Sequence, residues 1–419
     1  MNTFDMPLPV GQAGRTALNW RVLAICFFVT MVDGFDTMML AFLAPLIGHA
    51  FALQPAQIGQ LFGAGYFGAV LGAMLVGPLA DRFGRRAVLL CALVDTVAFT
   101  WLCAQADSAG ALMGWRFVAG LGLGAAVPTV IALTAESMPA SHRSRAVTWM
   151  FLGFPLGAVV GGALTAVFLS HGWRTIFQAG ALAALLMIPL VWWALPEAPW
   201  RAPAGQGGQK ARSGGPFASL AAQFADGRTP AALLLWLGVF CIMVVTYFLV
   251  SWMPSVVVRA GFSPEKAAVV GVLMNLGGIV GACVISQVLR HQAPWRLVAL
   301  SFMLGAFVVG AVGWGMTGLP LTLLLVFMVG LLVFGAQLNI PALAVQLFPP
   351  RVRGAGTGWT MGVGRLGSIV GPIAGGHLLG AGLQGSSLFA AVAVLTFVAG
   401  ICLLLAARLR PVAPDEQAA

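Results

Sequence analysis

Long apolar stretches recur along the whole chain, and they constrain its fold more than any other feature of the sequence. A bilayer-spanning helix needs about 20 mostly apolar residues. We expect twelve such helices, at 20–43, 58–80, 87–105, 111–134, 146–169, 175–195, 231–251, 266–289, 296–316, 320–343, 355–380 and 386–407. With 60% of its residues hydrophobic and 8% charged, the chain cannot cover a water-facing surface. The sequence therefore predicts an all-α integral membrane protein.

The positive charges indicate how the chain is oriented in the membrane. Most of the Lys and Arg residues that produce the net charge of +10 lie in short segments between the apolar stretches. With the N-terminus inside, seventeen of them fall on the cytoplasmic side, and only Arg174, Arg259 and Lys266 fall outside. Because cytoplasmic loops carry the excess of positive charge, we expect both termini to be cytoplasmic. The charges form no basic face with interleaved aromatic residues, so no nucleic-acid partner is expected.

The first apolar stretch is expected to remain in the protein as a transmembrane helix. It carries two aspartates and is followed by no small-residue cleavage site, unlike a signal peptide. The six cysteines stand singly inside apolar stretches, without the spacing of a metal site or a disulfide framework. No metal and no cofactor are therefore expected.

The longest polar break divides the chain into two halves. We predict an N-terminal six-helix bundle at 1–195, a cytoplasmic linker at 196–230 and a C-terminal six-helix bundle at 231–419. In each half, a proline and two arginines precede a helix with a Gly-x-x-x-Gly pair. This repetition predicts two pseudo-symmetric bundles in the same orientation, with a substrate site between them near the membrane midplane.

The loop between the second and third predicted helices has a pattern suited to a gate. It reads Gly77-Pro78-Leu79-Ala80-Asp81-Arg82-Phe83-Gly84-Arg85-Arg86. Glycines allow close helix approach, Asp81 can face a helix N-terminus, and the arginines can pair with acids of neighbouring helices. Glu136 is the candidate partner. The loop resembles the signature of the major facilitator superfamily, which implies the major facilitator fold and a role of Gly77, Asp81, Arg82, Arg85 and Arg86 in conformational switching.

The fourth predicted helix also carries a motif, Arg116-x-x-x-Gly120-x-Gly122-x-Gly124-x-x-x-Pro128. It is similar to a superfamily pattern whose arginine is linked to proton coupling. An arginine inside a span is costly unless it is paired or hydrated. The alternative is that Arg116 reaches the outer interface with its long side chain.

Two carboxylates lie deep in the first predicted helix, in the sequence Asp33-Gly34-Phe35-Asp36. The i, i+3 spacing places both on one helical face, where burial and mutual repulsion favour the protonated form of at least one of them. Because Asp36 lies nearer the outer side, where Arg116 also lies, we expect an Asp36–Arg116 salt bridge that protonation breaks. A fixed structural ion pair is the alternative.

The Asp-Gly-Phe-Asp sequence is similar to the hallmark of the aromatic acid:proton symporter family. Matching features along the chain include Ala135-Glu136 with Arg143, Trp252-Met253-Pro254 after Tyr247, Asn275-x-Gly277-Gly278-x-x-Gly281 and Gly362-x-Gly364-Arg365-x-Gly367. The resemblance covers about residues 20 to 408. It implies proton-coupled import, by alternating access, of a benzoate-, hydroxybenzoate- or phenylpropionate-like anion across a bacterial inner membrane. The expected partners are this anion, a proton and the lipid bilayer, and a monomer is expected.

Arg365 is the candidate for binding the substrate carboxylate, because it lies near the middle of the eleventh predicted helix and guanidinium matches carboxylate in a two-pronged geometry. The alternatives are pairing with an internal acid and reaching the interface. The residues expected to hold the ring and its hydroxyl are Tyr247, Trp252, Gln337 and Asn339. Trp252 could instead belong to the outer aromatic belt. Asp95 and His377 belong to no recognised motif and are interpreted as polar residues whose hydrogen bonds are satisfied.

Other functions fit the sequence less well. A proton-driven exporter of drugs or metabolites would carry Gly-x-x-x-Gly-Pro-x-x-Gly-Gly in the fifth helix, but this chain carries it in the eleventh, from Gly367 to Gly376. This favours the importer but leaves the exporter open. A sensor would need a signalling domain. A membrane enzyme is not expected, since no metal cluster, nucleophile elbow or phosphate loop is present. In the second half the gate motif is incomplete, and of its pattern only Arg290 remains between Val284 and His291.

Overall fold

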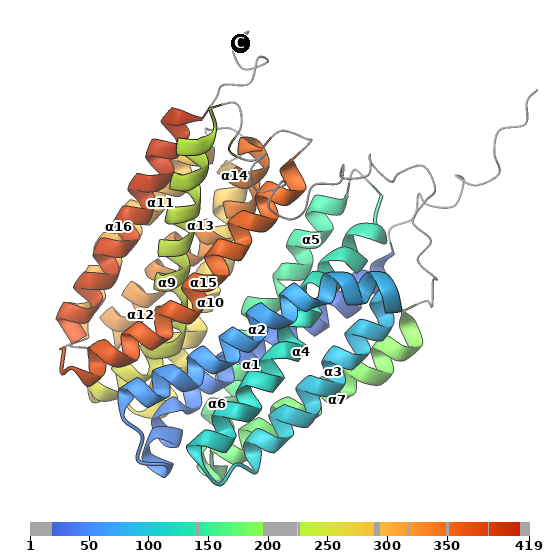
Figure 1. Ribbon diagram of the computed structural model, residues 1–419. Coiled ribbons are helices and arrows are strands. Elements are labelled where there is room, and N and C mark those ends of the chain that lie inside the picture. Colours follow the sequence, from blue (N-terminus) through green and yellow to red (C-terminus); the bar gives the residue numbers. More distant parts are fainter. Residues whose placement is uncertain are drawn as a thin grey trace, which may run out of the picture.

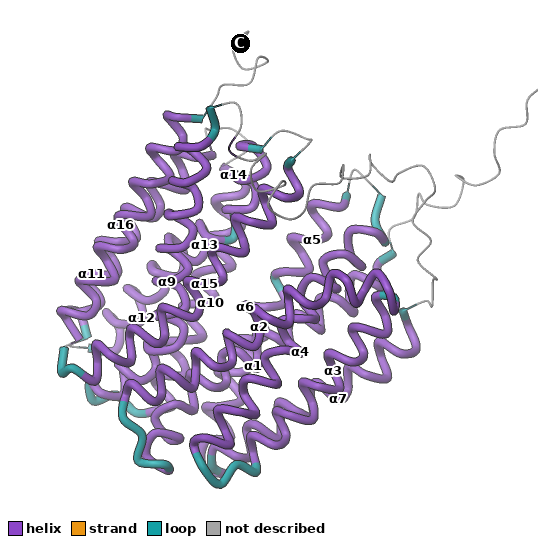
Figure 2. Tube along the Cα trace, in the orientation of Figure 1, coloured by secondary structure: helices purple, strands orange, loops and turns teal. Residues whose placement is uncertain are grey.

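The computed structural model describes residues 19–139, 142–195, 224, 227–288, 294–316, 318–348, 352–383 and 385–410. Inside the helices, the side chains of residues 76–79, 81, 82, 144, 169 and 353–355 are not part of this description. Nearly all of the described residues are helical, and none of them lies in a strand (Figure 2).

The first half of the chain forms six membrane-length helical segments, the fifth of which is broken. They are α1 (Trp20–Ala50), α2 (Pro55–Phe83), α3 (Arg85–Ala104), α4 (Ala109–Glu136), α5 with α6 (Arg143–Phe151 and Gly153–Phe168) and α7 (Trp173–Ala194). A short 3-10 turn, η1 (Leu169–His171), joins α6 to α7.

The second half also forms six segments, of which the fourth is broken. They are α9 (Thr229–Arg259), α10 (Pro264–Val288), α11 (Pro294–Gly315), a composite segment, α15 (Arg353–Gly380) and α16 (Gly385–Leu409). The composite segment consists of α12 (Leu319–Val329), the π-helical turn η3 (Gly330–Phe334), α13 (Gly335–Gln337) and α14 (Ile340–Leu347).

These segments confirm the predicted all-helical fold of twelve spans. Eleven of them, within the described residues, are long and apolar enough to cross a membrane. The twelfth, α15, is 28 residues long but is diluted by glycines and contains Arg365. Two predicted ends were wrong by several residues. The first helix was expected to end at residue 43, but α1 continues through Pro45 to Ala50. The seventh was expected to end at residue 251, but α9 continues through Pro254 to Arg259, because a transmembrane helix tolerates a proline whose missing N–H is compensated by its neighbours.

Prolines account for the breaks in these two helical segments, which the sequence did not predict. Pro155 has no N–H to donate to the carbonyl of Phe151, and the chain turns at Leu152 between α5 and α6. In the second half, Pro341 cannot donate to the carbonyl of Gln337, and the helix is interrupted at Leu338 and Asn339. Both breaks lie within a span, and residues next to each of them line the interior of the protein.

The Gly-x-x-x-Gly pairs make equivalent helix contacts in the two halves. In the first half, a side chain at Gly157 would collide with the backbone carbonyl of Met31 in α1. In the second half, a side chain at Gly371 would collide with the carbonyl of Val244 in α9. The glycines therefore allow α6 to approach α1 and α15 to approach α9 in the same manner.

The two bundles touch at one end of the molecule. Figure 1 shows that the helices of the two halves lie close together where α1 turns into α2 and diverge toward the end that carries α5 and α14. At the touching end, which we call the closed end, a Cβ on Gly59 of α2 would lie 2.7 Å from the carbonyl oxygen of Pro372 and 3.2 Å from the Cα of Gly376 in α15. Glycines at this crossing let the two backbones meet directly.

Candidate functional site

A buried ion pair joins α1 to α4 inside the first bundle. Arg116 donates from Nη1 to Oδ1 of Asp36 at 3.1 Å, and its Nη2 lies 2.8 Å from Oδ2. Asp36 is 2% exposed and Arg116 is 4% exposed, and the hydroxyl of Thr100 in α3 donates a further bond to Oδ1 at 3.1 Å. The predicted Asp36–Arg116 pair is therefore present. Arg116 does not reach the membrane interface.

The glycine motif of α4 brings Arg116 to this position. A side chain at Gly120 or Gly124 would collide with the backbone carbonyl of Gly65 or Ala69 in α2. On the adjacent face, Gly122 lies against α3, where its N–H donates to Oδ2 of Asp95 at 3.0 Å. This bond confirms the interpretation of Asp95 as a satisfied polar residue. The small residues allow α4 to pack tightly against both neighbours.

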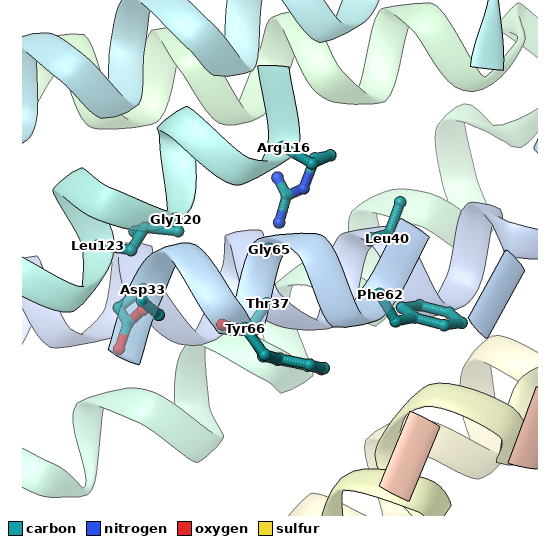
Figure 3. A pocket seen from close by; sticks show the side chains of 10 residues that line it. Asp33, Thr37, Leu40, Phe62, Gly65, Tyr66, Arg116, Gly120 and Leu123 are labelled. Atoms are coloured by element: carbon teal, nitrogen blue, oxygen red, sulfur yellow. The ribbon is translucent and has the colours of Figure 1, made fainter. Parts of the chain in front are cut away.

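Asp33, one turn before Asp36, faces a different environment. It is half-buried and borders a cavity of about 40 Å³, which we call cavity A. Cavity A is lined by Asp33, Thr37, Leu40, Phe62, Gly65, Tyr66, Ala69, Arg116, Gly120 and Leu123 (Figure 3). The two aspartates therefore have separate surroundings, although both lie on the inward side of α1.

Two tyrosines connect the bundles beside cavity A. Tyr66 of α2 packs edge-to-face on Tyr247 of α9, with ring centroids 4.8 Å apart and planes at 84°. The hydroxyl of Tyr66 also lies 3.4 Å from the hydroxyl of Ser251 in α9. Because α2 belongs to the first bundle and α9 to the second, this contact must change whenever the bundles move relative to each other.

Arg365 approaches the same region from α15. Its charge acts on Asp33 of α1 across the interface between the bundles, and on Tyr247 of α9 within its own bundle. The side chain is half-buried, and it forms no ion pair within 4 Å with any described residue. A guanidinium held in the protein interior without a close counter-ion is a site at which an anion can bind.

A second cavity, cavity B, lies beyond Tyr247 between α1, α6, α9, α10 and the broken segment. Its volume is about 80 Å³. It is lined by Met38, Phe154, Pro155, Thr246, Tyr247, Val250, Asn275, Gly278, Phe334, Gln337 and Leu338. The lining is mainly apolar and includes three aromatic rings, with the polar groups on α9, α10 and α13. Such a lining is typical of small-molecule sites.

Two of the four residues predicted to bind the ring line cavity B, and two do not. Tyr247 and Gln337 both line cavity B, where the Thr246 hydroxyl donates to Oε1 of Gln337 at 2.5 Å. Asn339 lies outside the lining, and its Nδ2 donates to the carbonyl of Gly335 at 2.9 Å.

Trp252 lines neither cavity. Its Nε1 donates to the carbonyl of Pro372 at 2.9 Å, and its ring packs against Phe62. At 1% exposure it also faces no lipid, which contradicts the alternative of an outer aromatic belt.

The predicted gate residues lie at the end of the molecule where the bundles diverge. Arg85 pairs with Glu136 at 2.5 Å, as predicted. Arg86 donates to the carbonyl of Trp192 and lies over its ring. Arg143 donates to the carbonyl of Met138 at 3.2 Å. Gly77, Asp81 and Arg82 belong to α2, but their side-chain surroundings lie outside the described residues, as does the region around Arg290.

Several residues at the site were not singled out from the sequence. Tyr66, Thr246 and Thr100 each contact a predicted site residue. Tyr66 could have been found, because it and Tyr247 are the two tyrosines of the chain and both lie in apolar stretches. The threonines carry no such signal, since a threonine in a transmembrane helix usually bonds its own backbone. His377 is exposed in the last turn of α15, and among the described residues no cluster suited to a metal ion occurs.

The sequence and structure are similar to those of known transporters. The sequence model of the Major Facilitator Superfamily matches residues 26–372. The chain is 35% identical to the gallate transporter of Pseudomonas putida, covering 93% of this chain and 92% of that protein. It is 32% identical to the 4-hydroxybenzoate transporter PcaK of Pseudomonas putida, covering 91% and 90%. It is 33% identical to the 3-(3-hydroxy-phenyl)propionate transporter of Escherichia coli (strain K12), covering 95% of each.

Two solved structures are similar in fold at low sequence identity. An inward-facing, unoccupied bacterial homolog of the human lysosomal transporter Spinster has a TM-score of 0.74 at 18% identity, covering 95% of this chain and 100% of that chain. The inward open xylose transporter XylE from E. coli has a TM-score of 0.73 at 18% identity, covering 92% and 95%.

Proposed function

Because the chain belongs to the Major Facilitator Superfamily, we propose that it imports a small aromatic carboxylate together with a proton. The resemblance found in the sequence is confirmed by the family match and by relatives named as transporters of aromatic acids. One observation carries the substrate proposal. Arg365, an arginine that forms no ion pair within 4 Å with a described residue, acts electrostatically on Tyr247, and Tyr247 lines a cavity that contains aromatic rings.

The substrate is held in two parts. Its carboxylate pairs with Arg365, since a guanidinium and a carboxylate match in charge and shape. Its ring enters cavity B, where Tyr247, Phe154 and Phe334 provide apolar faces. A cavity of about 150 Å³ accepts a benzene ring in another helical protein. Since cavity B measures about 80 Å³, substrate entry requires the bundles to separate slightly around Tyr247.

The proton acts at the Asp36–Arg116 pair. In the interior, removal of one partner of a buried ion pair leaves the other charge uncompensated, at a cost of about 3–5 kcal/mol. Protonation of Asp36 has that effect on Arg116, so it loosens the connection of α1 to α4. The carboxylate of Asp33 interacts electrostatically with both Asp36 and Arg365. Through these two interactions, Asp33 links the protonation state of α1 to the anion site.

Transport proceeds by alternating access of the site to the two sides of the membrane. The closed end, where Gly59 meets Pro372 and Gly376, is assigned to the outer side by the excess of positive residues at the other end. The protein acts as a monomer in a bacterial inner membrane, with both termini in the cytoplasm. Arg85, Glu136, Arg86 and Arg143 stabilise the inner ends of the helices, and Gly77, Asp81 and Arg82 complete the gate as the family resemblance implies.

Uptake by purified protein in liposomes tests this function. The liposomes carry an acid-outside pH gradient and receive radiolabelled benzoate, 4-hydroxybenzoate, gallate or 3-(3-hydroxyphenyl)propionate. Protein-free liposomes and a protonophore are the controls, because weak acids also cross lipid unaided. We expect protein-dependent accumulation that the protonophore abolishes. If folded protein accumulates none of these acids, the import function is wrong, and efflux driven by the same gradient becomes the function to test.

A further inference from the structure

Asn275, in the middle of α10, presents an unused hydrogen-bond acceptor to cavity B. The residue is 3% exposed and lines the cavity. Its amide nitrogen is anchored, since Nδ2 donates to the carbonyl of Gly271 at 2.9 Å and also faces the sulfur of Met38 at 4.0 Å. No described residue donates a hydrogen bond to its Oδ1. An asparagine that served only to pack helices together would be expected to use both ends of its amide.

A second amide in the same cavity has a donor that is only weakly used. Gln337 accepts from Thr246 through Oε1, which fixes the orientation of its amide. Its Nε2 then donates to the sulfur of Met243 at 3.2 Å. A thioether is a weak acceptor, so an oxygen atom of a ligand can replace it at little cost. Cavity B thus offers one free acceptor and one exchangeable donor in otherwise mainly apolar surroundings.

Both polar groups line cavity B together with Tyr247, whereas Arg365 is not part of that lining. Tyr247 contributes to the lining of cavity B, and it is also one of the residues on which the charge of Arg365 acts. A ring whose carboxylate pairs with Arg365 and whose face lies on Tyr247 therefore directs its far edge toward α10 and α13. A phenolic hydroxyl has one donor and acceptor lone pairs, which complements the two amides.

We propose that Asn275 is a specificity-determining residue that accepts a hydrogen bond from a ring hydroxyl of the substrate, so that the transporter selects hydroxylated aromatic carboxylates over unsubstituted ones. This inference rests on the proposed import of aromatic carboxylates. Its energetic basis is asymmetric. A hydroxyl finds its partner in Asn275, whereas an unsubstituted ring that fills cavity B covers Oδ1, keeps water away from it and offers no donor in return. Sites built around such polar groups reject the analogue that lacks the hydroxyl.

The size of the selection follows from the cost of an unpaired buried acceptor. Leaving such a group unsatisfied weakens binding by about tenfold or more. A fluorine in place of the hydroxyl is of similar size but cannot donate, so it separates hydrogen bonding from shape. We expect the wild-type protein to bind 4-hydroxybenzoate or 3-hydroxybenzoate about tenfold more tightly than benzoate and the matching fluorobenzoate.

Calorimetric titration of purified protein with benzoate and with the hydroxy- and fluorobenzoates tests the assignment. In Asn275→Leu, which keeps the volume and removes the acceptor, the preference for the hydroxyl should fall to less than about threefold through weaker binding of the hydroxylated acid. Benzoate affinity should not fall. The control is Ser286→Ala on the same helix, where the hydroxyl donates to the carbonyl of Cys283 at 2.9 Å, and it should keep the wild-type preference.

The outcomes separate this inference from the proposed function. Undiminished preference for the hydroxyl in Asn275→Leu would overturn the role of Asn275. Equal wild-type affinity for benzoate and both hydroxybenzoates would overturn it without any variant, even if the variant fails to fold. In either case the uptake of aromatic acids into liposomes could still occur, and import would stand. If no aromatic acid is accumulated, the proposed function itself fails.

Discussion

Asp33 and Asp36 show how two identical side chains one turn apart on α1 acquire different roles. Asp36 is enclosed by Arg116 and Thr100 within the first bundle. Asp33 borders cavity A and interacts with the charge of Arg365 from the other bundle. The i, i+3 spacing predicts a shared face, but it cannot predict which neighbour each carboxylate meets, because those neighbours come from three other helices.

Arg365 provides the first prediction at the scale of a residue. Arg365→Ala removes the only proposed partner of the substrate carboxylate, and an anion left unpaired in the interior binds weakly. We expect 4-hydroxybenzoate affinity, measured by calorimetry, to fall by about thirtyfold or more. Arg408→Ala, in the exposed last turn of α16, should leave the affinity unchanged. Unaltered binding by folded Arg365→Ala would move the carboxylate site elsewhere.

Trp252 gives a prediction about stability rather than binding. Trp252→Phe removes the indole N–H that donates to the buried carbonyl of Pro372. We expect a loss of about 1–2 kcal/mol in the stability of the α9–α15 contact, visible as a lower thermal unfolding temperature of the detergent-solubilised protein. Substrate affinity should remain within about twofold, since the side chain lines neither cavity. A large loss of affinity at unchanged unfolding temperature would restore the substrate role expected from the sequence.

At the scale of the elements, glycines set how closely helices approach. The pairs at Gly157 and Gly371 could be recognised in the sequence, and the structure gives each the same type of contact with a facing helix. The contact between Gly59 and Gly376 was not predicted, because the two residues lie in different bundles and no sequence motif contains both of them. A sequence motif identifies a helix face but not the partner of that face.

The closed end yields a prediction for the α2–α15 crossing. Gly59→Leu places a bulky side chain against the carbonyl of Pro372 and the backbone of Gly376, which cannot yield as a side chain would. The closed end then cannot form, and we expect liposome uptake to fall by about tenfold or more while substrate binding persists. The control is Gly114→Leu in α4, because a side chain there meets no atom within 4 Å. Transport at the wild-type rate by Gly59→Leu would show that this contact is dispensable.

The broken segment from α12 to α14 shows why the side-chain directions of Gln337 and Asn339 could not be predicted from the sequence. The sequence placed Gln337 and Asn339 on the tenth predicted span and assigned both to the ring, but the π-helical turn at Gly330–Phe334 and the interruption at Leu338 and Asn339 rotate the later residues. As a result Gln337 faces cavity B and Asn339 does not. An ideal helical period drawn through the segment cannot predict this rotation, since a π-helical turn has i→i+5 bonds and shifts the later side chains around the helix axis.

For the whole molecule, the composition alone predicts a membrane protein, and the repeated apolar stretches predict its twelve spans. The arrangement of the bundles could not be predicted in the same way. The Tyr66–Tyr247 and Arg365–Asp33 interactions connect residues that are far apart in the sequence, and they depend on which end of the molecule is closed. Local patterns therefore give the helices, whereas the site depends on how the two halves dock.

The charge distribution leads to a prediction about orientation. Alkaline phosphatase is active only outside the cytoplasm, so a fusion after Phe51, in the turn between α1 and α2, should be active in a bacterial host. A fusion after Arg410, at the end of α16, should be inactive, because seventeen Arg and Lys residues were assigned to the cytoplasmic side and three to the outer side. Green fluorescent protein fused at the same two positions should show the opposite pattern, with no fluorescence after Phe51 and fluorescence after Arg410. An active phosphatase at the C-terminus would invert the assigned topology.

The coupling of proton and substrate through Asp36 can be measured by comparing net accumulation with exchange in liposomes. Asp36→Asn mimics the protonated carboxyl and keeps its size. We expect it to exchange labelled for unlabelled aromatic acid while failing to accumulate the acid under an acid-outside gradient. Asp95→Asn, which alters an aspartate of α3 that is not part of the Asp36–Arg116 pair and can still accept from Gly122, should accumulate the acid as the wild type does. If Asp36→Asn accumulates the acid normally, the proton is carried by a different group.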